Sequence, residues 1–232
     1  MKVAIIQPYL FPYIGYLQLM NAVDKFIIYD DVNFINKGWI NRNRILVNGR
    51  THLFTVPLKN ASQNVLIKDL QLDINEKWKN KFLKSLELAY KRAPSFYKEF
   101  EIVEQIINTK SRFIKDWHLK SFALIRDHLD INVTLVETST KYNNRNIKGQ
   151  ERIIDICTKE SADQYINPIG GQSLYDEQPF LDKKIILNFL ESDQITYKQF
   201  NNKFVPWLSI IDVLMFNGKE RTSELLKRYT LI

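Results

Sequence analysis

The stretch KVAIIQPYLFPYIGYLQLMNAVDKFIIYDD, residues 2–31, decides the fold. Residues 3–6 are mostly β-branched and are closed by Gln7 and Pro8, which predicts a buried strand followed by a loop. Residues 14–23 carry the apolar stripe of a helix, and residues 25–29 predict a second buried strand. A strand, a helix and a strand in this order form a βαβ unit, which is right-handed and binds ligands beyond the carboxyl ends of its strands.

The rest of the chain continues an α/β pattern around two departures. Asn48 and Gly49 form a strong turn signal, so residues 44–57 predict a hairpin. Residues 75–129 show helical periodicity instead, with Ser95 as the expected N-cap of the second helix. Further elements are expected as strands at 66–72, 132–138, 164–166, 185–190 and 195–199, and as helices at 149–159, 208–216 and 221–229.

These elements predict one α/β domain over residues 1–232. We expect a mostly parallel sheet flanked by helices, with nucleotidyltransferase-like or Rossmann-like topology and a small hairpin. The helical segment at about 75–129 is expected to be an insertion that packs over one sheet face as a lid.

Composition excludes several classes of protein. A chain of 232 residues with 45% hydrophobic and 25% charged residues can bury a full core, so it is neither disordered nor dependent on disulfides. Cys157 is the only cysteine and the three histidines are poorly spaced, so we expect no metal site. Cys157 is expected in the core, and His118 and His128 are expected as packing or surface residues. No apolar run is long enough to span a membrane, and we expect a cytoplasmic protein.

The positive charge is partly local. The net charge is +7, and residues 31–60 carry five Lys or Arg against one Asp. Such a cluster fits nucleic acid, an anionic membrane face or a phosphate-bearing small molecule. No Gly-x-Ser-x-Gly, Walker-type or Gly-x-Gly-x-x-Gly sequence occurs, which disfavours serine hydrolases, P-loop kinases and ordinary dinucleotide folds.

Residues 30–44 form a long predicted loop that is dense in binding groups. The adjacent carboxylates of Asp30 and Asp31 can hold a cation, accept a hydroxyl or ammonium, or act as a base. The cations at 37, 42 and 44 suit phosphates, and the aromatic rings at 34 and 39 suit stacking on a base or sugar. The competing interpretation is a turn capped by the carboxylates, with cations that are merely exposed.

Three other segments offer candidates. In residues 7–16 we favour Gln7 and Gly15, while the tyrosines at 9 and 13 suit aromatic packing equally well; the absence of a His-x-Gly-His sequence disfavours ordinary adenylyl transfer. The paired glycines of residues 167–176 let backbone approach a ligand closely, although a tight turn explains them equally. Ser209 and Asp212 share one helix face, where capping is a slightly better explanation of Ser209 than catalysis.

Three blocks of sequence together resemble one family. They are QPYLFPYIGYLQLMNAVDKFIIYDDVNFINKGWINRNRI at 7–45, YINPIGGQSLYD at 165–176 and FVPWLSIIDVLMFNG at 204–218. In order and content they resemble the WbqC-like family of bacterial proteins. The resemblance implies a cytoplasmic role in making O-antigen, the polysaccharide of lipopolysaccharide, or a related surface polysaccharide, by transferring an amino acid such as glycine onto an amino sugar.

The resemblance and the residues together predict an acyl or aminoacyl transferase acting on a nucleotide-linked amino sugar. The acyl group is expected to be carried by a carrier protein or by coenzyme A. The sequence does not indicate which cofactor, if any, the protein uses. Alternatives are an ATP-dependent ligase or nucleotidyltransferase-like enzyme, and a non-catalytic partner or nucleic-acid-binding module, of which nucleic-acid binding is disfavoured. The predicted catalytic residues are Asp30, Asp31, Gln7 and Asn43. The predicted substrate-binding residues are Gly15, Tyr16, Lys37, Trp39, Asn41, Arg42, Arg44, Asn167, Gly170, Gly171, Tyr175, Asp176, Ser209 and Asp212.

Overall fold

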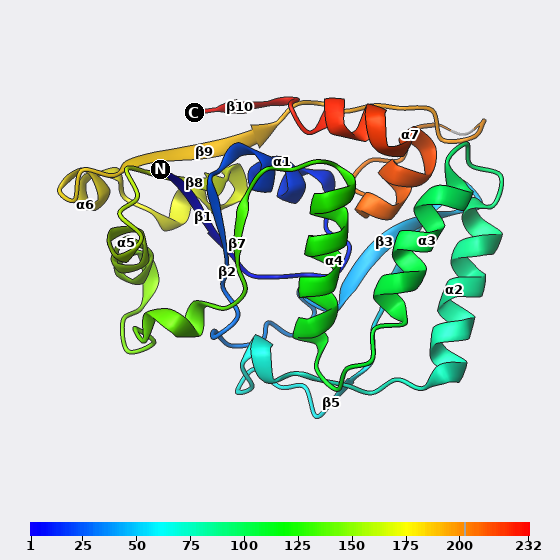
Figure 1. Ribbon diagram of the computed structural model, residues 1–232, viewed down its shortest axis with the longest axis horizontal. Helices are drawn as coiled ribbons and strands as arrows, with labels where there is room; N and C mark the ends of the chain where they lie inside the picture. The colour runs from blue at the N-terminus through cyan, green and yellow to red at the C-terminus, as the bar shows by residue number, and fades with distance from the viewer. Residues whose placement is uncertain (202) are drawn as a thin grey trace.

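A six-stranded sheet forms the centre of the computed structural model, which describes residues 1–201 and 203–232 (Figure 1). Its strands lie in the order β10-β9-β8-β1-β2-β7. Five strands are parallel, and β10 pairs antiparallel with β9. The strands are β1 (Lys2–Ile6), β2 (Lys25–Ile28), β7 (Thr134–Val136), β8 (Gln164–Pro168), β9 (Ile186–Ser192) and β10 (Tyr229–Leu231).

The strand order reverses next to β1. The chain steps from β1 to β2 and β7 in one direction, and then returns to place β8 and β9 on the other side of β1. This is the order of Rossmann-like sheets, in which ligands bind beyond the carboxyl ends of the strands where the direction reverses. The prediction of a mostly parallel, Rossmann-like sheet flanked by helices is therefore confirmed.

The two faces of the sheet are covered by different helices. Side chains alternate between faces, so Ala4 and Phe26 enter one core while Ile5 and Ile27 enter the other. Helix α1 (Ile14–Ala22) packs on the first face. Helices α5 (Gly149–Lys159) and α6 (Glu177–Leu181) lie at the opposite end of the molecule from the helical segment 76–128 in Figure 1. Cys157 of α5 is fully buried in the second core, as expected.

Three helices fill the segment predicted to be helical: α2 (Glu76–Tyr90), α3 (Phe96–Ile107) and α4 (Ile114–His128). Helix α4 reaches α1 through Phe122, whose ring stacks on Tyr16 with centroids 5.3 Å apart. Helix α2 contacts the predicted hairpin segment through Phe82 and Phe54, with centroids 5.0 Å apart. The assignment of this segment as an inserted lid stays a prediction. Among the described residues, no helix is both long and apolar enough to cross a membrane.

The predicted hairpin is present as β3 (Arg42–Val47) and β4 (Arg50–Thr55). Its turn residues Asn48 and Gly49 have φ angles of 49° and 72°, the left-handed conformation that a type I′ turn requires. The segment expected as a strand at 66–72 is mostly a 3₁₀ turn, η1 (Ile67–Asp69). It is followed by a short strand, β6 (Gln71–Leu72), which pairs with β5 (Leu58–Lys59).

The predictions near the C-terminal end were partly wrong. Residues 195–199 form no strand. The side chains of Tyr197 and Gln199 instead both donate hydrogen bonds to the buried carboxylate of Asp212. Helix α7 (Ile210–Leu225) has a kink at Gly218, which confirms a break between the two predicted helices, but it ends before Tyr229, which begins β10. Ser95 occupies the N-cap position of α3, but its side chain makes no capping hydrogen bond.

Candidate functional site at the carboxyl edge of the sheet

The loops that follow the parallel strands carry most of the predicted site residues. Gln7 follows β1, Asp30 and Asp31 follow β2 after one residue, and Asn167 lies at the end of β8. The backbone N–H of Tyr29 donates to Ile6 O at 2.9 Å, so the loops after β1 and β2 leave the sheet side by side. This edge also carries the strand-order reversal, where ligands are expected.

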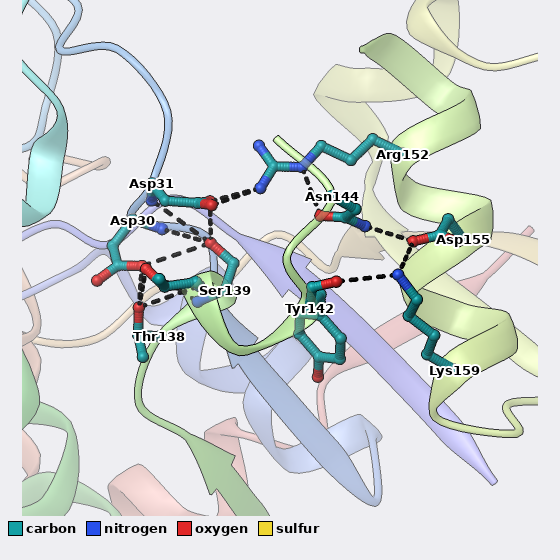
Figure 2. Close-up of polar contacts among 10 residues, drawn as sticks. Asp30, Asp31, Thr138, Ser139, Tyr142, Asn144, Arg152, Asp155 and Lys159 are labelled. Carbon is teal, nitrogen blue, oxygen red and sulfur yellow. Dashed lines mark hydrogen bonds and ion pairs between the residues drawn. The ribbon is translucent and has the colours of Figure 1, made fainter. Parts of the chain in front are cut away.

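Asp31 is held by a buried cation. Arg152 of α5 donates to both carboxylate oxygens, at 2.7 and 2.6 Å, and the Ser139 hydroxyl also donates to Asp31 (Figure 2). Asp31 and Arg152 are 4% and 3% exposed. Asn144 Oδ1 in turn accepts from Arg152 Nε at 3.0 Å, so the guanidinium is fixed on two sides. The structure therefore gives Asp31 an anchoring position, although the sequence offered it equally as a base.

Asp30 keeps one oxygen outside this network. Its Oδ1 accepts from Thr138 Oγ1 at 2.7 Å and from Ser139 N at 3.1 Å. Figure 2 shows its second oxygen pointing away from these donors, and no hydrogen-bond donor of the described residues meets it. Burial raises the pKa of Asp30 above its usual value. A carboxylate with a free oxygen and a raised pKa suits proton transfer better than its neighbour does.

Thr138 and Ser139 come from the start of η2 (Ser139–Tyr142), directly after β7. Their hydrogen bonds to Asp30 and Asp31 connect the segment after β7 to the loop after β2. Helix α5 contributes Arg152. We call Asp30, Asp31, Thr138, Ser139 and Arg152 the carboxylate cluster. Its members come from three segments that are more than 100 residues apart at the extremes, for example 121 between Asp31 and Arg152.

An aromatic pocket of about 340 Å³ lies beside the loop that follows β1. Trp39 and Trp207 are 43% and 63% exposed, so their rings are available to a ligand. The guanidinium of Arg44 lies 4.8 Å from the centroid of the Trp39 ring, and the rings of Tyr13 and Trp207 have centroids 5.1 Å apart. We call this site the aromatic pocket; its lining residues are Tyr9, Tyr13, Trp39, Asn43, Arg44 and Trp207.

Trp207 has a left-handed backbone. Its φ angle of 60° is unfavourable for a bulky residue, and the left-handed conformation costs roughly 1–2 kcal/mol. Strain of this kind is found most often where a side chain must be presented to a ligand. The strained backbone and the exposed ring of Trp207 therefore support a binding role for the aromatic pocket.

Two predicted site residues hold the loop of this pocket from behind. Asn43 Nδ2 donates to the carbonyls of Leu10 at 3.2 Å and Phe11 at 2.5 Å. Ser209 Oγ donates to Phe11 O at 2.8 Å and also caps α7 by accepting from Ile211 N at 3.2 Å. Ser209 is fully buried, which corrects its prediction as a substrate contact, whereas Asn43 both lines the pocket and positions the loop.

Asp212 is also placed in the interior. It is fully buried and accepts hydrogen bonds from Tyr197 at 2.6 Å, Gln199 at 2.7 Å and Tyr90 at 2.9 Å. Burial raises its pKa, which these three donors oppose. Tyr16 is 5% exposed and stacks on Phe122. Neither Asp212 nor Tyr16 is open to substrate, so their predicted binding roles are replaced by packing.

The loop that carries Trp39 is shaped by its own polar residues. Arg42 Nε donates to Gly38 O at 2.8 Å, and its guanidinium also donates to Lys37 O. Asn41 Nδ2 donates to Val56 O at 2.8 Å. Arg42 and Asn41 thus hold the loop, while Lys37 is exposed. Arg44 is the predicted cation whose guanidinium lies in the aromatic pocket.

His118 supports the same loop from α4. It is fully buried, and its Nε2 donates to Ile40 O at 2.9 Å, since a carbonyl can only accept. Burial lowers the pKa of the imidazole to about 4. His118 is therefore a packing residue, as predicted, and it stays neutral at pH 7.

The neutral state of His118 predicts a specific pH dependence. The unfolded chain takes up a proton near pH 6.5 and the folded protein only near pH 4, so stability falls as pH is lowered through this window. Between pH 7 and pH 4.5 the wild type should lose about 2.5 kcal/mol of unfolding free energy that a His118→Gln variant does not lose. Urea unfolding of both proteins at the two pH values measures the difference. An identical pH dependence of the two proteins would contradict the assignment.

Glycines mark two close approaches at this edge. A Cβ on Gly15 would lie 3.0 Å from the ring of Tyr13, so glycine lets that ring lie against the first turn of α1. A Cβ on Gly171, within η3 (Ile169–Leu174), would lie 2.1 Å from Asn167 Nδ2. A side chain at position 171 would have to displace the Asn167 amide, so the packing of Asn167 explains this glycine without a ligand.

The remaining predicted residues divide into two groups. Asn167 Oδ1 accepts from Tyr165 at 3.1 Å, and the hydroxyls of Tyr165 and Tyr175 lie 3.2 Å apart, so these three form a polar group at the end of β8. Gly170 and Asp176 are exposed on the loop that follows. Nothing in these contacts tests a binding role, which stays a prediction.

Sequence analysis missed Trp207 and Arg152, and it did not prefer Tyr9 or Tyr13 over packing. An arginine on the apolar face of the predicted helix 149–159 was a usable signal, because a buried arginine needs a carboxylate partner. The position of Trp207 directly after Pro206 was a weaker signal.

Comparisons with known proteins identify a relative and a family. An uncharacterized protein of Mycobacterium tuberculosis, Rv1507c, is 29% identical over 226 residues, which cover 94% of this chain and 95% of that protein. No solved structure matches the chain. The WbqC-like protein family matches residues 7–224, which include both the carboxylate cluster and the aromatic pocket. The chain therefore belongs to the WbqC-like protein family.

Proposed function

We propose that this protein is a cytoplasmic enzyme of bacterial surface polysaccharide synthesis, which transfers an acyl or aminoacyl group to the amine of a nucleotide-linked amino sugar. The observation that carries the proposal is the aromatic pocket at the carboxyl edge of a Rossmann-like sheet, with the Arg44 guanidinium on the Trp39 ring. Family membership is compatible with an enzyme.

The aromatic pocket suits a nucleotide. The exposed faces of Trp39 and Trp207 can stack on a base or a sugar, as aromatic side chains do in many nucleotide sites. Among the described residues, no hydrogen bond or ion pair occupies the Arg44 guanidinium, so its donors can meet a diphosphate. The volume of about 340 Å³ lies within the range of small-molecule sites.

The carboxylate cluster suits the chemical step. An ammonium cannot attack a carbonyl, so the sugar amine must lose a proton, and the free oxygen of Asp30 can accept it. The amine nitrogen then forms a bond to the acyl carbon, and the bond from that carbon to the donor breaks, with its electron pair leaving on the donor. The nitrogen gives up a second proton to that leaving group, so the products are the amide and the protonated donor. Backbone N–H groups near Gly15 or Gly170 and Gly171 are the candidate donors to the tetrahedral oxyanion.

Binding should depend on Arg44 and Trp39. We expect a nucleotide-linked amino sugar to raise the melting temperature of the wild type. Replacing Arg44 by Ala should weaken binding about 10- to 100-fold, because a charged hydrogen bond contributes about 1.5–3 kcal/mol. Trp39→Ala should lose about 1–3 kcal/mol of stacking. Calorimetric titration with uridine- and thymidine-diphosphate amino sugars measures both losses.

The matched control is Arg145→Ala, which removes an exposed arginine outside the pocket and should leave affinity unchanged. Unchanged affinity in both Arg44→Ala and Trp39→Ala would reject the aromatic pocket as the substrate site. A thermal shift with ATP and Mg²⁺ alone would replace the transferase proposal by a ligase or nucleotidyltransferase. Binding to oligonucleotides that weakens steeply with salt would replace it by nucleic-acid binding.

A further inference from the structure

A second cavity lies away from the site proposed above. Its volume is about 750 Å³, and it is formed by the turn of the β3–β4 hairpin, the end of α2, the segment 198–201 and the middle of α7. It shares no lining residue with the aromatic pocket. We call it the hairpin cavity.

The charge of the hairpin cavity is positive and uncompensated. Arg92 and Lys198 both line it, and none of its described lining residues is acidic. Over the part of the chain that the structure describes, neither cation lies within 4.0 Å of a carboxylate, although thirteen ion pairs form elsewhere. The Arg92 guanidinium instead lies 5.6 Å from the centroid of the Phe200 ring. Two free cations at one cavity favour an anionic ligand.

The walls of the cavity are apolar beside these cations. The rings of Phe200 and Phe216 meet edge to face, with centroids 4.7 Å apart. Leu88 on α2 is 64% exposed at the cavity, which leaves a large apolar side chain without cover. Phe200 has a φ angle of 49°, the second strained aromatic backbone after Trp207 that lies at a cavity.

We propose that the hairpin cavity binds an amphipathic anion, a molecule with an apolar body and one phosphate or carboxylate group. The anionic group would lie between Arg92 and Lys198, and the apolar body would lie against Phe200, Phe216 and Leu88. The volume lies within the range of sites for small molecules. The proposal does not rest on the acyl-transfer reaction, because it uses none of the residues of the aromatic pocket or the carboxylate cluster.

Fluorescent probes of matched shape test the role of charge. We expect anilinonaphthalene sulfonate, an anion, to bind the whole protein saturably and to be displaced by octyl phosphate or octanoate. The better competitor identifies the preferred anionic group. Arg92→Ala and Lys198→Ala should each weaken sulfonate binding roughly tenfold, while affinity for uncharged phenylnaphthylamine should stay the same. Both cations are exposed, so the variants should fold.

Two control variants locate the probe. Lys110→Ala makes the same change of net charge on an exposed lysine outside the cavity, and it should not affect binding. Arg44→Ala should not affect binding either. The proposal is overturned if Arg44→Ala weakens sulfonate binding and Arg92→Ala does not, if Lys110→Ala has the effect of Arg92→Ala, or if the charged and uncharged probes respond alike to every variant.

Discussion

Replacing Arg152 by methionine should lower the free energy of unfolding by about 3–5 kcal/mol, since it leaves a buried carboxylate without its cation. Asp31 and Arg152 are almost completely buried and share two hydrogen bonds of 2.6 and 2.7 Å. Methionine retains most of the length and apolar volume of the arginine chain, so the loss reports mainly the uncompensated charge. Urea unfolding followed by circular dichroism measures it.

Two further variants isolate the cause. Arg221→Met makes the same replacement in an exposed ion pair with Glu224, where we expect a loss of at most about 1 kcal/mol. Asp31→Asn combined with Arg152→Met removes both charges, so the double variant should be more stable than Arg152→Met alone. A loss in Arg152→Met no larger than that in Arg221→Met would show that Asp31 does not depend on this cation.

Replacing Asp30 by asparagine should lower turnover about 10²- to 10⁴-fold while changing stability little, the range expected when a general base is removed. The asparagine amide oxygen can still accept from Thr138 and Ser139, as Asp30 Oδ1 does, so the loop should keep its place. Asp73→Asn, an exposed aspartate with the same substitution, is the control and should leave turnover unchanged.

The pH profile separates a base from a merely structural residue. Asp30 must be ionised to accept a proton, and burial raises its pKa, so the rate should rise with pH until this carboxyl is ionised. Asp30→Asn should lose this limb of the profile as well as the rate. Full turnover in Asp30→Asn would assign proton removal to another group or to an amine that is already neutral.

The fold was predictable where local patterns were strong. The β1-α1-β2 unit followed from one apolar run on each side of a segment with helical spacing of apolar residues, and the hairpin followed from Asn48 and Gly49. Residues 195–199 looked like a strand because of their alternation, but contacts with Asp212 on the helix that follows determined their conformation. β9 pairs with β8 on one side and with β10 on the other, and no local pattern specifies that the distant segment at 229–231 completes the sheet.

The site was predictable as a region but less so by residue. The loop 30–44 does contribute Asp30, Trp39 and Arg44 to the carboxyl edge of the sheet. Side-chain roles depended on partners that are remote in sequence: Asn43 was predicted as catalytic and Ser209 as substrate-binding, although both donate to the carbonyl of Phe11. The alternative role of Ser209 as a helix cap, which the sequence slightly favoured over catalysis, is confirmed. Polar residue types alone do not distinguish a group that meets substrate from one that satisfies buried backbone.

The hydrogen bond from Ser209 to Phe11 has a consequence for the order of folding. Residues 11 and 209 are 198 positions apart, and the Ser209 N–H also donates to Arg44 O while Ile210 N–H donates to Pro12 O. A ribosome that has made the first βαβ unit cannot yet complete the aromatic pocket, because the beginning of α7 must close it. Contacts of such long range slow folding, so the aromatic pocket stays incomplete in the nascent chain until synthesis has passed residue 210.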